Sequence, residues 1–415
     1  MTSRSLFLVL PLFLAYLEAC GSSADSAGSA ARGPASAQAG AAAVAAGGKS
    51  VQDNAAGAAN NPQAVGGAPS ASSSAGTSSG YTPPPTVWNS AKSAGVTDAQ
   101  LQSEYAIWKA AHVEACSNGS SVVVSDGNVV SEGIGYGMLL SVGMNEQPLF
   151  DAFWKYYQDH LDNDGLMNWK TGKCDAPGNN NQNAATDADL DVAMALVQAA
   201  ARWPNGGYLA KAQAQAGKVI QFESDMCDGR RILRPGDAFG GCSDPNDQRI
   251  NPSYFSPGYY KVFAHYFSDQ ASTWTALGDG SYQLYAIYQA RMANLVPDWS
   301  GPDGSDNGSQ YWYDACRTPF RVSVDYAWTG DTRAKTFMQN ISSWVDRNGG
   351  LPKAAQQQNS AFIGAFALAG GYEQGKFDGY VSAWLGAQVD DTPYYQGTLR
   401  VLYLLVAAGK FSSTL

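Results

Sequence analysis

Residues 185–201 read ATDADLDVAMALVQAAA, a stretch in which a polar opening passes directly into an apolar run. Within that run Leu190, Met194 and Val197 recur at steps of four and three residues. This spacing puts side chains on one face of an α-helix. The stretch therefore predicts a helix that begins near Thr186 and carries acidic side chains in its first turn.

The same spacing recurs between Asp98 and Gly409. The other apolar sets are Leu101, Tyr105 and Trp108; Phe150, Phe153, Trp154, Tyr157 and Leu161; Tyr259, Val262, Phe263 and Tyr266; Leu284, Ile287, Tyr288 and Leu295; Phe337, Ile341 and Trp344; and Leu399, Leu402 and Val406. Thr97, with Gln100 three places on, forms a capping-box pattern before the first set. About twelve helical segments result, and no long alternating pattern predicts a strand. We predict an all-α single domain, with at most short strands in its loops.

The N-terminal residues differ in composition from the rest of the chain. Arg4 and the apolar run 6–17 resemble a secretory signal, and the run is too short to span a bilayer. Cys20 follows in the manner of a lipoprotein cleavage site, although Glu18 is unusual there; the alternative is a simple signal peptide cleaved nearby. We predict a signal over residues 1–20, a disordered Ala/Gly/Ser/Pro-rich linker over 21–85 and a folded domain over 86–415.

The chain is acidic, with a formal net charge of −10. Nucleic acids and anionic lipids both require basic surface, so the charge argues against either as a partner. A neutral polymer is compatible with it. We expect a secreted or cell-surface bacterial protein that touches the membrane only through a lipid on Cys20, and we expect a monomer because the sequence gives no sign of oligomerisation.

Five cysteines follow Cys20, and export would allow them to form disulfides. Cys227 and Cys242 bracket a loop rich in Gly and Asp, and we predict that they pair. Because five is an odd number, at least one thiol stays free. No C-x-x-C spacing occurs, so we expect no zinc cluster and no other metal or cofactor.

The three histidines, His112, His160 and His265, lie within or at the end of apolar helical stretches. Packed or surface imidazoles explain them better than a nucleophile triad or a metal site. Acid and base chemistry is therefore expected from carboxylates.

Three acidic clusters qualify. In the first, Glu132 lies among glycines that would let a substrate approach closely, although a glutamate that opens an apolar helix is also favoured by the helix dipole. In the second, Thr186 or Asp187 could equally cap the following helix. A calcium loop is disfavoured there because Val192 occupies the position where such a loop needs glycine.

The third cluster runs from Tyr313 to Pro319. Pro319 suits a first helical turn, which places Asp314 on the loop before the helix. Arg317, three residues after Asp314, would share a helix face with it. A neighbouring arginine keeps a carboxylate ionised, as a general base requires.

Several aromatic residues lie in polar loops rather than in apolar runs. They are Trp169, Tyr254, Trp312, Tyr313, Tyr394 and Tyr395. Such side chains can stack on sugar rings, and ordinary amphipathic packing is the alternative for each of them.

Together these clusters resemble glycoside hydrolase family 8, whose members include bacterial endoglucanases, lichenases, chitosanases and xylanases. The similarity covers roughly Trp88 to Phe411. Its pieces occur in the family's order: Ser131-Glu132-Gly133-x-Gly135-Tyr136-Gly137-Met138; Gly165-Leu166-Met167-x-Trp169; Ala185-Thr186-Asp187-Ala188-Asp189; Asn251-Pro252-Ser253-Tyr254-Phe255; and Tyr313-Asp314-Ala315-x-Arg317-x-Pro319. The pair Tyr394-Tyr395 precedes the last helix. Phe320 and Val192 are mild departures from the usual residues.

The resemblance implies an (α/α)6 barrel and an inverting hydrolase of β-1,4-linked polysaccharide. Glu132 would be the general acid, Asp314 the general base, and Asp187 would bind and distort the sugar at the cleavage point. Arg317 would orient the acids. Trp169, Tyr254, Tyr313, Tyr394 and Tyr395 would contact substrate.

Inversion needs room for a water molecule, so the two carboxyl groups should lie roughly 6.5–9.5 Å apart, and the pKa of Glu132 should be raised. The expected substrate is cellulose or mixed-linkage β-glucan. The alternatives are an endo-xylanase or exo-oligoxylanase of the same family, and then a chitosanase. A non-catalytic carbohydrate-binding protein and a polysaccharide lyase are disfavoured, the first because Glu132 and Asp314 are both present.

Overall fold

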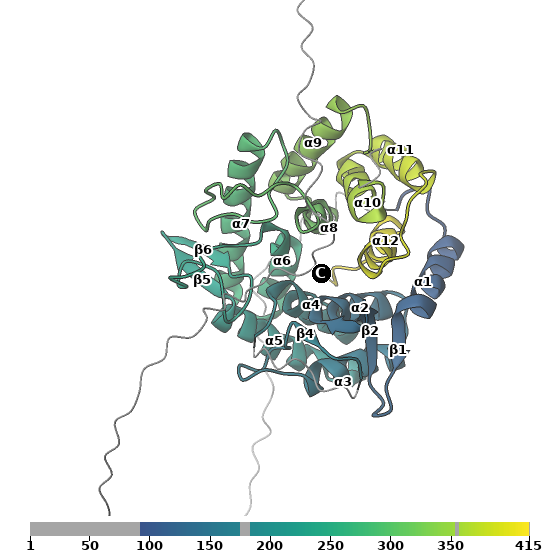
Figure 1. The fold of residues 1–415 in the computed structure, drawn as a ribbon, viewed down its shortest axis with the longest axis vertical. Helices are drawn as coiled ribbons and strands as arrows, with labels where there is room; N and C mark the ends of the chain where they lie inside the picture. The colour runs from purple at the N-terminus through teal and green to yellow at the C-terminus, as the bar shows by residue number, and fades with distance from the viewer. Residues whose placement is uncertain (1–91, 175–182, 353–356, 415) are drawn as a thin grey trace, which may run out of the picture. The chain divides into compact units, whose positions relative to one another are not determined.

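The computed structural model describes residues 92–174, 183–352 and 357–414 (Figure 1). The predicted signal, the predicted lipidation site Cys20 and the predicted linker lie outside the described residues. No helix among those described is long and apolar enough to cross a membrane.

Twelve α-helices make up most of the described chain. Figure 1 shows that they alternate between an outer and an inner ring. The outer helices are α1 (Asp98–His112), α3 (Gln147–Asp159), α5 (Tyr208–Phe222), α7 (Ala271–Arg291), α9 (Thr332–Arg347) and α11 (Gln374–Leu385). The inner helices are α2 (Ser131–Gly143), α4 (Thr186–Arg202), α6 (Pro257–Tyr266), α8 (Thr318–Thr329), α10 (Ser360–Ala369) and α12 (Tyr394–Ala407). The predicted barrel of paired helices is confirmed.

Side-chain composition explains which helices are inner and which are outer. In α1 only Leu101, Tyr105 and Trp108 are buried, so this helix has one apolar face and otherwise meets water. In α2 every residue from Gly133 to Val142 is buried, so this helix is covered on all sides. A helix without a polar face is stable only inside a ring of others.

Glycines allow α2 to approach its neighbours closely. A Cβ at Gly135 would lie 3.0 Å from the Cβ of Asp191 on α4, and a Cβ at Gly137 would lie 2.9 Å from the ring of Phe153 on α3. Larger residues at these two positions would push the three helices apart. The glycines around Glu132 therefore serve helix packing as well as the site.

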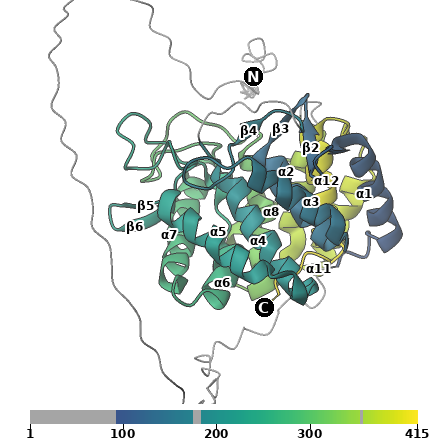
Figure 2. The same cartoon turned by 90° about the horizontal axis from the view of Figure 1, so that it is seen from below.

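The short strands of one sheet lie at the end of the barrel opposite the chain's C-terminus (Figure 2). An antiparallel sheet has the order β1 (Val113–Ala115), β2 (Ser121–Ser125), β3 (Asn128–Val130) and β4 (Lys170–Thr171), and a separate hairpin pairs β5 (Ser224–Cys227) with β6 (Arg230–Leu233). The strand β3 runs directly into α2, so the sheet fixes the point at which that helix begins.

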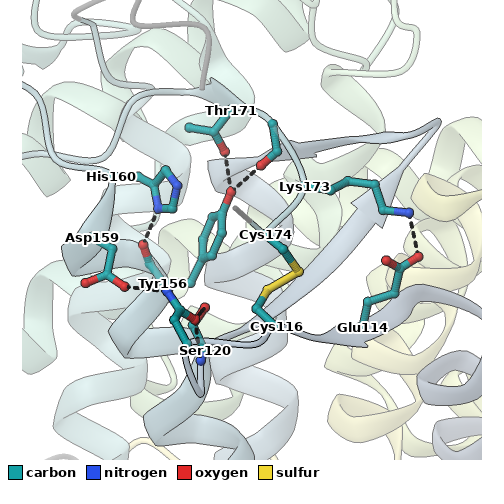
Figure 3. Close-up of a disulfide and its surroundings, with 11 residues drawn as sticks. Glu114, Cys116, Ser120, Tyr156, Asp159, His160, Thr171, Lys173 and Cys174 are labelled. Carbon is teal, nitrogen blue, oxygen red and sulfur yellow. Dashed lines mark hydrogen bonds and ion pairs between the residues drawn. A yellow bond between two sulfur atoms is a disulfide. The ribbon is translucent and has the colours of Figure 1, made fainter. Parts of the chain in front are cut away.

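Two disulfides tie down segments at and beside the strands. Cys227–Cys242 confirms the predicted pair, and Cys116–Cys174 is a second bridge that the sequence did not indicate. Figure 3 shows this second bridge linking the segments that follow β1 and β4, beside the Tyr156 hydroxyl, which lies 2.8 Å from Thr171 Oγ1. Cys316 is the buried free thiol that the odd count requires.

Two helix ends differ from the predicted pattern. Leu161 lies beyond the end of α3 because a turn held by Asp162 follows, whose Oδ1 accepts the Leu166 amide at 3.0 Å. Leu295 lies beyond α7 because the backbone reverses at Ala293 and Asn294, both with positive φ. The capping at Thr97 is confirmed, since its Oγ1 accepts the Gln100 amide at 3.1 Å.

Candidate active site

The predicted functional residues meet where the inner helices begin. Glu132 is the second residue of α2, Asp187 the second of α4, and Tyr394 the first of α12. Arg317 ends a short 3-10 helix (Ala315–Arg317) directly before α8, and Asp314 is the residue that precedes this turn. The N-terminal end of a helix carries a partial positive charge, so this end of the barrel favours a cluster of carboxylates.

Arg317 joins the three predicted acids, and we call the four residues the Arg317 centre. Arg317 Nη1 donates to Glu132 Oε2 and to Asp187 Oδ2, each at 2.6 Å. Arg317 Nη2 donates to Asp314 Oδ1 at 2.8 Å. Glu132 and Asp314 thus bind different nitrogens of one guanidinium, which stands between them. The predicted pairing of Asp314 with Arg317 is confirmed.

The three carboxylates differ in their access to water. The side chain of Asp187 is 4% exposed, that of Glu132 18% and that of Asp314 31%. Burial raises the pKa of Glu132 to about 7, and the nearby charges of Asp187 and Asp314 act in the same direction, against the opposing effect of Arg317. A carboxyl group with such a pKa can hold a proton near neutral pH and donate it.

Glu132 is held from two sides. The chain leaves β3 at Val130 in an extended conformation and turns into α2, which fixes the backbone of Glu132 in the first helical turn. The Tyr394 hydroxyl donates to Glu132 Oε1 at 2.9 Å. Gly133 is needed for this approach, because a Cβ there would lie 3.0 Å from the Tyr394 hydroxyl oxygen.

Asp187 does not cap α4, and neither does Thr186, so the capping interpretation was wrong. The N-cap residue is Ala185, which makes no side-chain capping bond. Thr186 instead donates to the carbonyl oxygen of Arg234 at 2.7 Å, because the β6 segment passes beside it. The Asp187 side chain turns inward to Arg317, and burial raises its pKa.

The acids that alternate after Asp187 have separate partners. Asp189 accepts a hydrogen bond from the Tyr157 hydroxyl, and Asp191 pairs with Arg321. Asp189 points to a different side of the helix from the other two acids. Asp187 and Asp191 share a face one turn apart but pair with different arginines, so the three carboxylates do not converge. The described residues contain one group of three potential metal ligands, Asp225 with Cys227 and Cys242, and its two sulfurs are joined in a disulfide.

The predicted aromatic residues line the same end of the barrel, with different exposures. Tyr254 is buried, and the Arg317 guanidinium carbon lies 5.2 Å from its ring centroid. Trp169 is half-buried, and its carbonyl oxygen accepts the Ser131 amide at 2.9 Å, next to Glu132. Trp312 is 39% exposed and packs edge-on against Tyr313. Trp312 thus presents the most open of these rings.

The tyrosine pair lies inside a helix and not before it, which corrects the prediction. Tyr394 and Tyr395 are the first residues of α12, after Pro393 at the N-cap. Proline suits a helix start, so Pro393 was a signal in the sequence that could have located this boundary. The Tyr395 hydroxyl donates to the Tyr313 carbonyl oxygen at 2.5 Å, so it ties α12 to the loop that bears Asp314.

Ser253 was not predicted as a site residue, although its motif was noticed. Arg317 Nη2 donates to Ser253 Oγ at 2.9 Å, and Ser253 Oγ in turn donates to Asn251 Oδ1 at 2.7 Å. Asn251 also accepts the Ser253 amide at 3.0 Å. This short polar chain holds the same nitrogen that donates to Asp314, and it therefore helps to fix the plane of the guanidinium.

A second arginine lies one helical turn deeper on α8. Arg321 donates through Nη2 to Asp191 Oδ2 at 2.8 Å, and neither side chain is exposed to water. The Tyr259 hydroxyl accepts from Arg321 Nη1 at 3.2 Å. We call Arg321 and Asp191 the Arg321 centre.

Comparisons with a family model, with known proteins and with solved structures agree with one another. The family model "Glycosyl hydrolases family 8" matches residues 82–409. Endoglucanase A of Acetivibrio thermocellus is 34% identical over 76% of this chain and 70% of that protein. A β-glucanase of Niallia circulans is 29% identical over 76% of this chain and 85% of its own. A solved apo structure of a β-1,3-1,4-glucanase from Paenibacillus sp. X4 superimposes with a TM-score of 0.65 at 25% identity and covers 75% of this chain and 91% of that one.

Proposed function

The chain belongs to glycosyl hydrolase family 8, and from that premise we propose that it cleaves internal β-1,4 linkages of a glucan with inversion at the anomeric carbon. It is a glycoside hydrolase. Relatives named endoglucanase and β-glucanase favour cellulose or mixed-linkage β-glucan as the substrate. The residues 86–415 would form the catalytic domain.

The observation that carries the proposal is the unequal environment of three carboxylates on one arginine. Glu132 would be the general acid, because burial raises its pKa to about 7 and it can therefore protonate the leaving oxygen. Asp314 is the most exposed of the three and would activate the attacking water. Asp187, the least exposed of the three, would hold the sugar ring in a distorted conformation.

Inversion requires the acid and the base to act from opposite faces of the sugar. Arg317 supports such a division, since it holds Glu132 through Nη1 and Asp314 through Nη2. We expect the two carboxyl groups to be separated by roughly 6.5–9.5 Å in the enzyme–substrate complex, which leaves space for a water molecule.

Aromatic side chains around the Arg317 centre would provide the sugar contacts. Trp169 and Tyr313 are half-buried and present one ring face, while the exposed indole of Trp312 suits a neighbouring sugar. Tyr254 lies against Arg317 and is the least accessible. Tyr394 and Tyr395 would support Glu132 and the Asp314 loop, and would meet substrate only with their edges.

The decisive experiment is product analysis with the anomeric configuration recorded. The purified chain is incubated separately with carboxymethyl-cellulose, barley β-glucan, xylan and chitosan, and early products are followed by chromatography and proton NMR. A ladder of oligosaccharides from glucan, released as the α-anomer, is the expected result. A ladder from xylan alone would replace the substrate, and β-anomers would reject Asp314 as the general base.

For the N-terminal residues we propose secretion and a lipid on Cys20, followed by the linker 21–85. The support is the arrangement of a basic residue, a short apolar run and a cysteine. Metabolic labelling with a radioactive fatty acid in a bacterial host should mark the full chain and not the Cys20→Ser variant. Equal labelling of both would reject lipidation at this residue. We further propose a monomer, which light scattering of the purified chain would test.

A further inference from the structure

Asp298, which lies outside the Arg317 centre, accepts two hydrogen bonds from the turn that carries Asp314. Asp298 Oδ1 accepts the Trp312 amide at 2.9 Å and the Ala315 amide at 2.7 Å. These amides stand on either side of the two residues between them, Tyr313 and Asp314. A single oxygen atom thus fixes both ends of the segment on which Asp314 sits.

Asp298 is itself anchored to the rest of the site. Its amide donates to the Gln310 carbonyl oxygen at 2.8 Å. Two residues later, Ser300 exchanges two backbone hydrogen bonds with Ile250, at 2.9 and 3.1 Å. Ile250 directly precedes Asn251, which holds Ser253 against Arg317. The backbone around Asp298 is therefore linked to both partners of Arg317 Nη2, Asp314 and Ser253.

The surroundings of Asp298 also carry charge. Burial raises the pKa of Asp298 to about 7, and the charge of Asp314 adds to this effect, while the two amides and Arg317 oppose it. Tyr311 and Cys316 are the other titratable groups that face it. Asp298 is thus a carboxyl group close to Asp314 that takes up a proton near pH 7.

We propose that Asp298 is a positioning residue for the general base: its carboxylate holds the Trp312–Ala315 turn so that Asp314 keeps the orientation in which it activates water. The inference rests on the proposed role of Asp314. A base that is displaced by about 1 Å can lose on the order of 100-fold in rate. Asparagine can replace the accepting oxygen of Asp298, whereas alanine cannot.

The test compares Asp298→Ala, Asp298→Asn and Asp303→Ala on whichever glucan the parent cleaves. Asp303 is the matched control, because its Oδ1 accepts the Ser305 amide at 2.8 Å in the same long loop but away from Asp314. We expect Asp298→Ala to lower kcat about 100-fold with little change in KM. We expect Asp298→Asn to restore most of kcat, and Asp303→Ala to match the parent.

A pH profile provides a readout that a merely structural role would not move. Asp298→Asn cannot take up a proton, so any loss of kcat that accompanies protonation of Asp298 near pH 7 should disappear, and the acidic limb of kcat should shift to lower pH. This measurement remains informative if Asp298→Ala does not fold. The inference is overturned if both Asp298 variants keep kcat within threefold of the parent, or if asparagine restores nothing and leaves the acidic limb in place.

Asp314→Asn is measured in parallel, because it separates the two ideas. An active Asp314→Asn variant would reject the proposed function itself, whatever Asp298 does. An inactive Asp314→Asn variant together with a fully active Asp298→Ala variant would reject only the positioning role.

Discussion

The Arg317 centre and the Arg321 centre are built from the same parts and behave differently. Arg317 stands directly before α8 and Arg321 lies four residues later on it, while Asp187 and Asp191 are four residues apart on α4. In the Arg321 centre one arginine meets one aspartate, and neither is exposed. In the Arg317 centre one arginine meets three carboxylates, of which Asp314 is 31% exposed.

The difference is one of charge balance. The deeper pair has one acid for one base, so its charges balance without water. In the Arg317 centre a single positive charge cannot compensate three negative ones, and one carboxyl group tends to keep its proton. That group is Glu132, whose burial raises its pKa to about 7. Burial of a carboxyl group that shares one arginine with two other acids, and not the ion pair as such, thus supplies a transferable proton.

The largest expected effect is on turnover, from the Arg317 centre. Glu132→Gln removes the proton donor while keeping the side-chain shape, so kcat should fall by about 10²–10⁴-fold. Folding should remain intact, because a buried acid is replaced by a neutral amide. Steady-state kinetics on the glucan substrate and a thermal melt test both statements.

Glu114→Gln is the matched control for this variant. Glu114 forms an exposed ion pair with Lys173 beside the sheet (Figure 3). This change should leave kcat as it is. A Glu132→Gln enzyme with more than a tenth of the parent activity would mean that another group donates the proton.

The next effect is on stability, from the Arg321 centre. Asp191→Asn leaves Arg321 charged and buried without its counter-ion, which should cost about 3–5 kcal/mol in the free energy of unfolding. Urea denaturation measures this loss. Activity per folded molecule should change little, since the Arg317 centre is untouched.

Asp346→Asn gives the comparison on the surface. Asp346 pairs with Lys376, and its side chain is 52% exposed. Water screens this pair, so its loss should cost less than about 1 kcal/mol. Equal losses for the two variants would show that burial does not distinguish the Arg321 centre.

The acids of the Arg317 centre were predictable from the sequence, and their partners only in part. Asp314 and Arg317 are three residues apart, so helical geometry alone brings them together. Glu132 and Asp187 reach the same arginine from other helices, 185 and 130 residues away. Only the closed barrel fixes such contacts, and the resemblance to a family supplied them where the residue pattern could not.

Other features were not predicted, either because the sequence carries only a weak signal for them or because the neighbouring residues in the sequence suggested a different contact. Thr186 looks like a cap, but the neighbouring β6 segment offers its hydroxyl a better acceptor in the Arg234 carbonyl. Asp298 stands alone in a loop, and nothing in its spacing indicates that it accepts amides 14 and 17 residues later. Long-range hydrogen bonds of this kind leave no periodic pattern.

A smaller effect concerns pH and sharpens the idea of charge balance. The general acid must be protonated, and the pKa of Glu132 is raised to about 7, so kcat/KM should fall about tenfold per unit above that value. The same shift acts on stability. The folded chain keeps this proton between the ordinary 4.5 and about 7 while the unfolded chain loses it, so stability should decline as pH rises through that window.

Glu132→Gln tests the stability part of this statement. The variant cannot titrate at this position, so its unfolding free energy should decline less between these two pH values than that of the parent. An identical pH dependence of the two proteins would place the titration on other groups, such as Asp189, whose pKa burial raises to about 8.

The smallest effect comes from one hydroxyl at the edge of the Arg317 centre. Tyr394 donates to Glu132 Oε1 at 2.9 Å and so favours the ionised carboxylate, which lowers the pKa of Glu132 against the larger effect of burial. In Tyr394→Phe the alkaline limb of kcat/KM should move up by less than about one pH unit, and kcat should fall about fivefold from lost orientation. Tyr395→Phe is the control, since its hydroxyl donates to the Tyr313 carbonyl and not to Glu132. If both variants move the alkaline limb equally, the shift reflects a general change in polarity, and the direct bond to Glu132 has no separate part in setting its proton affinity.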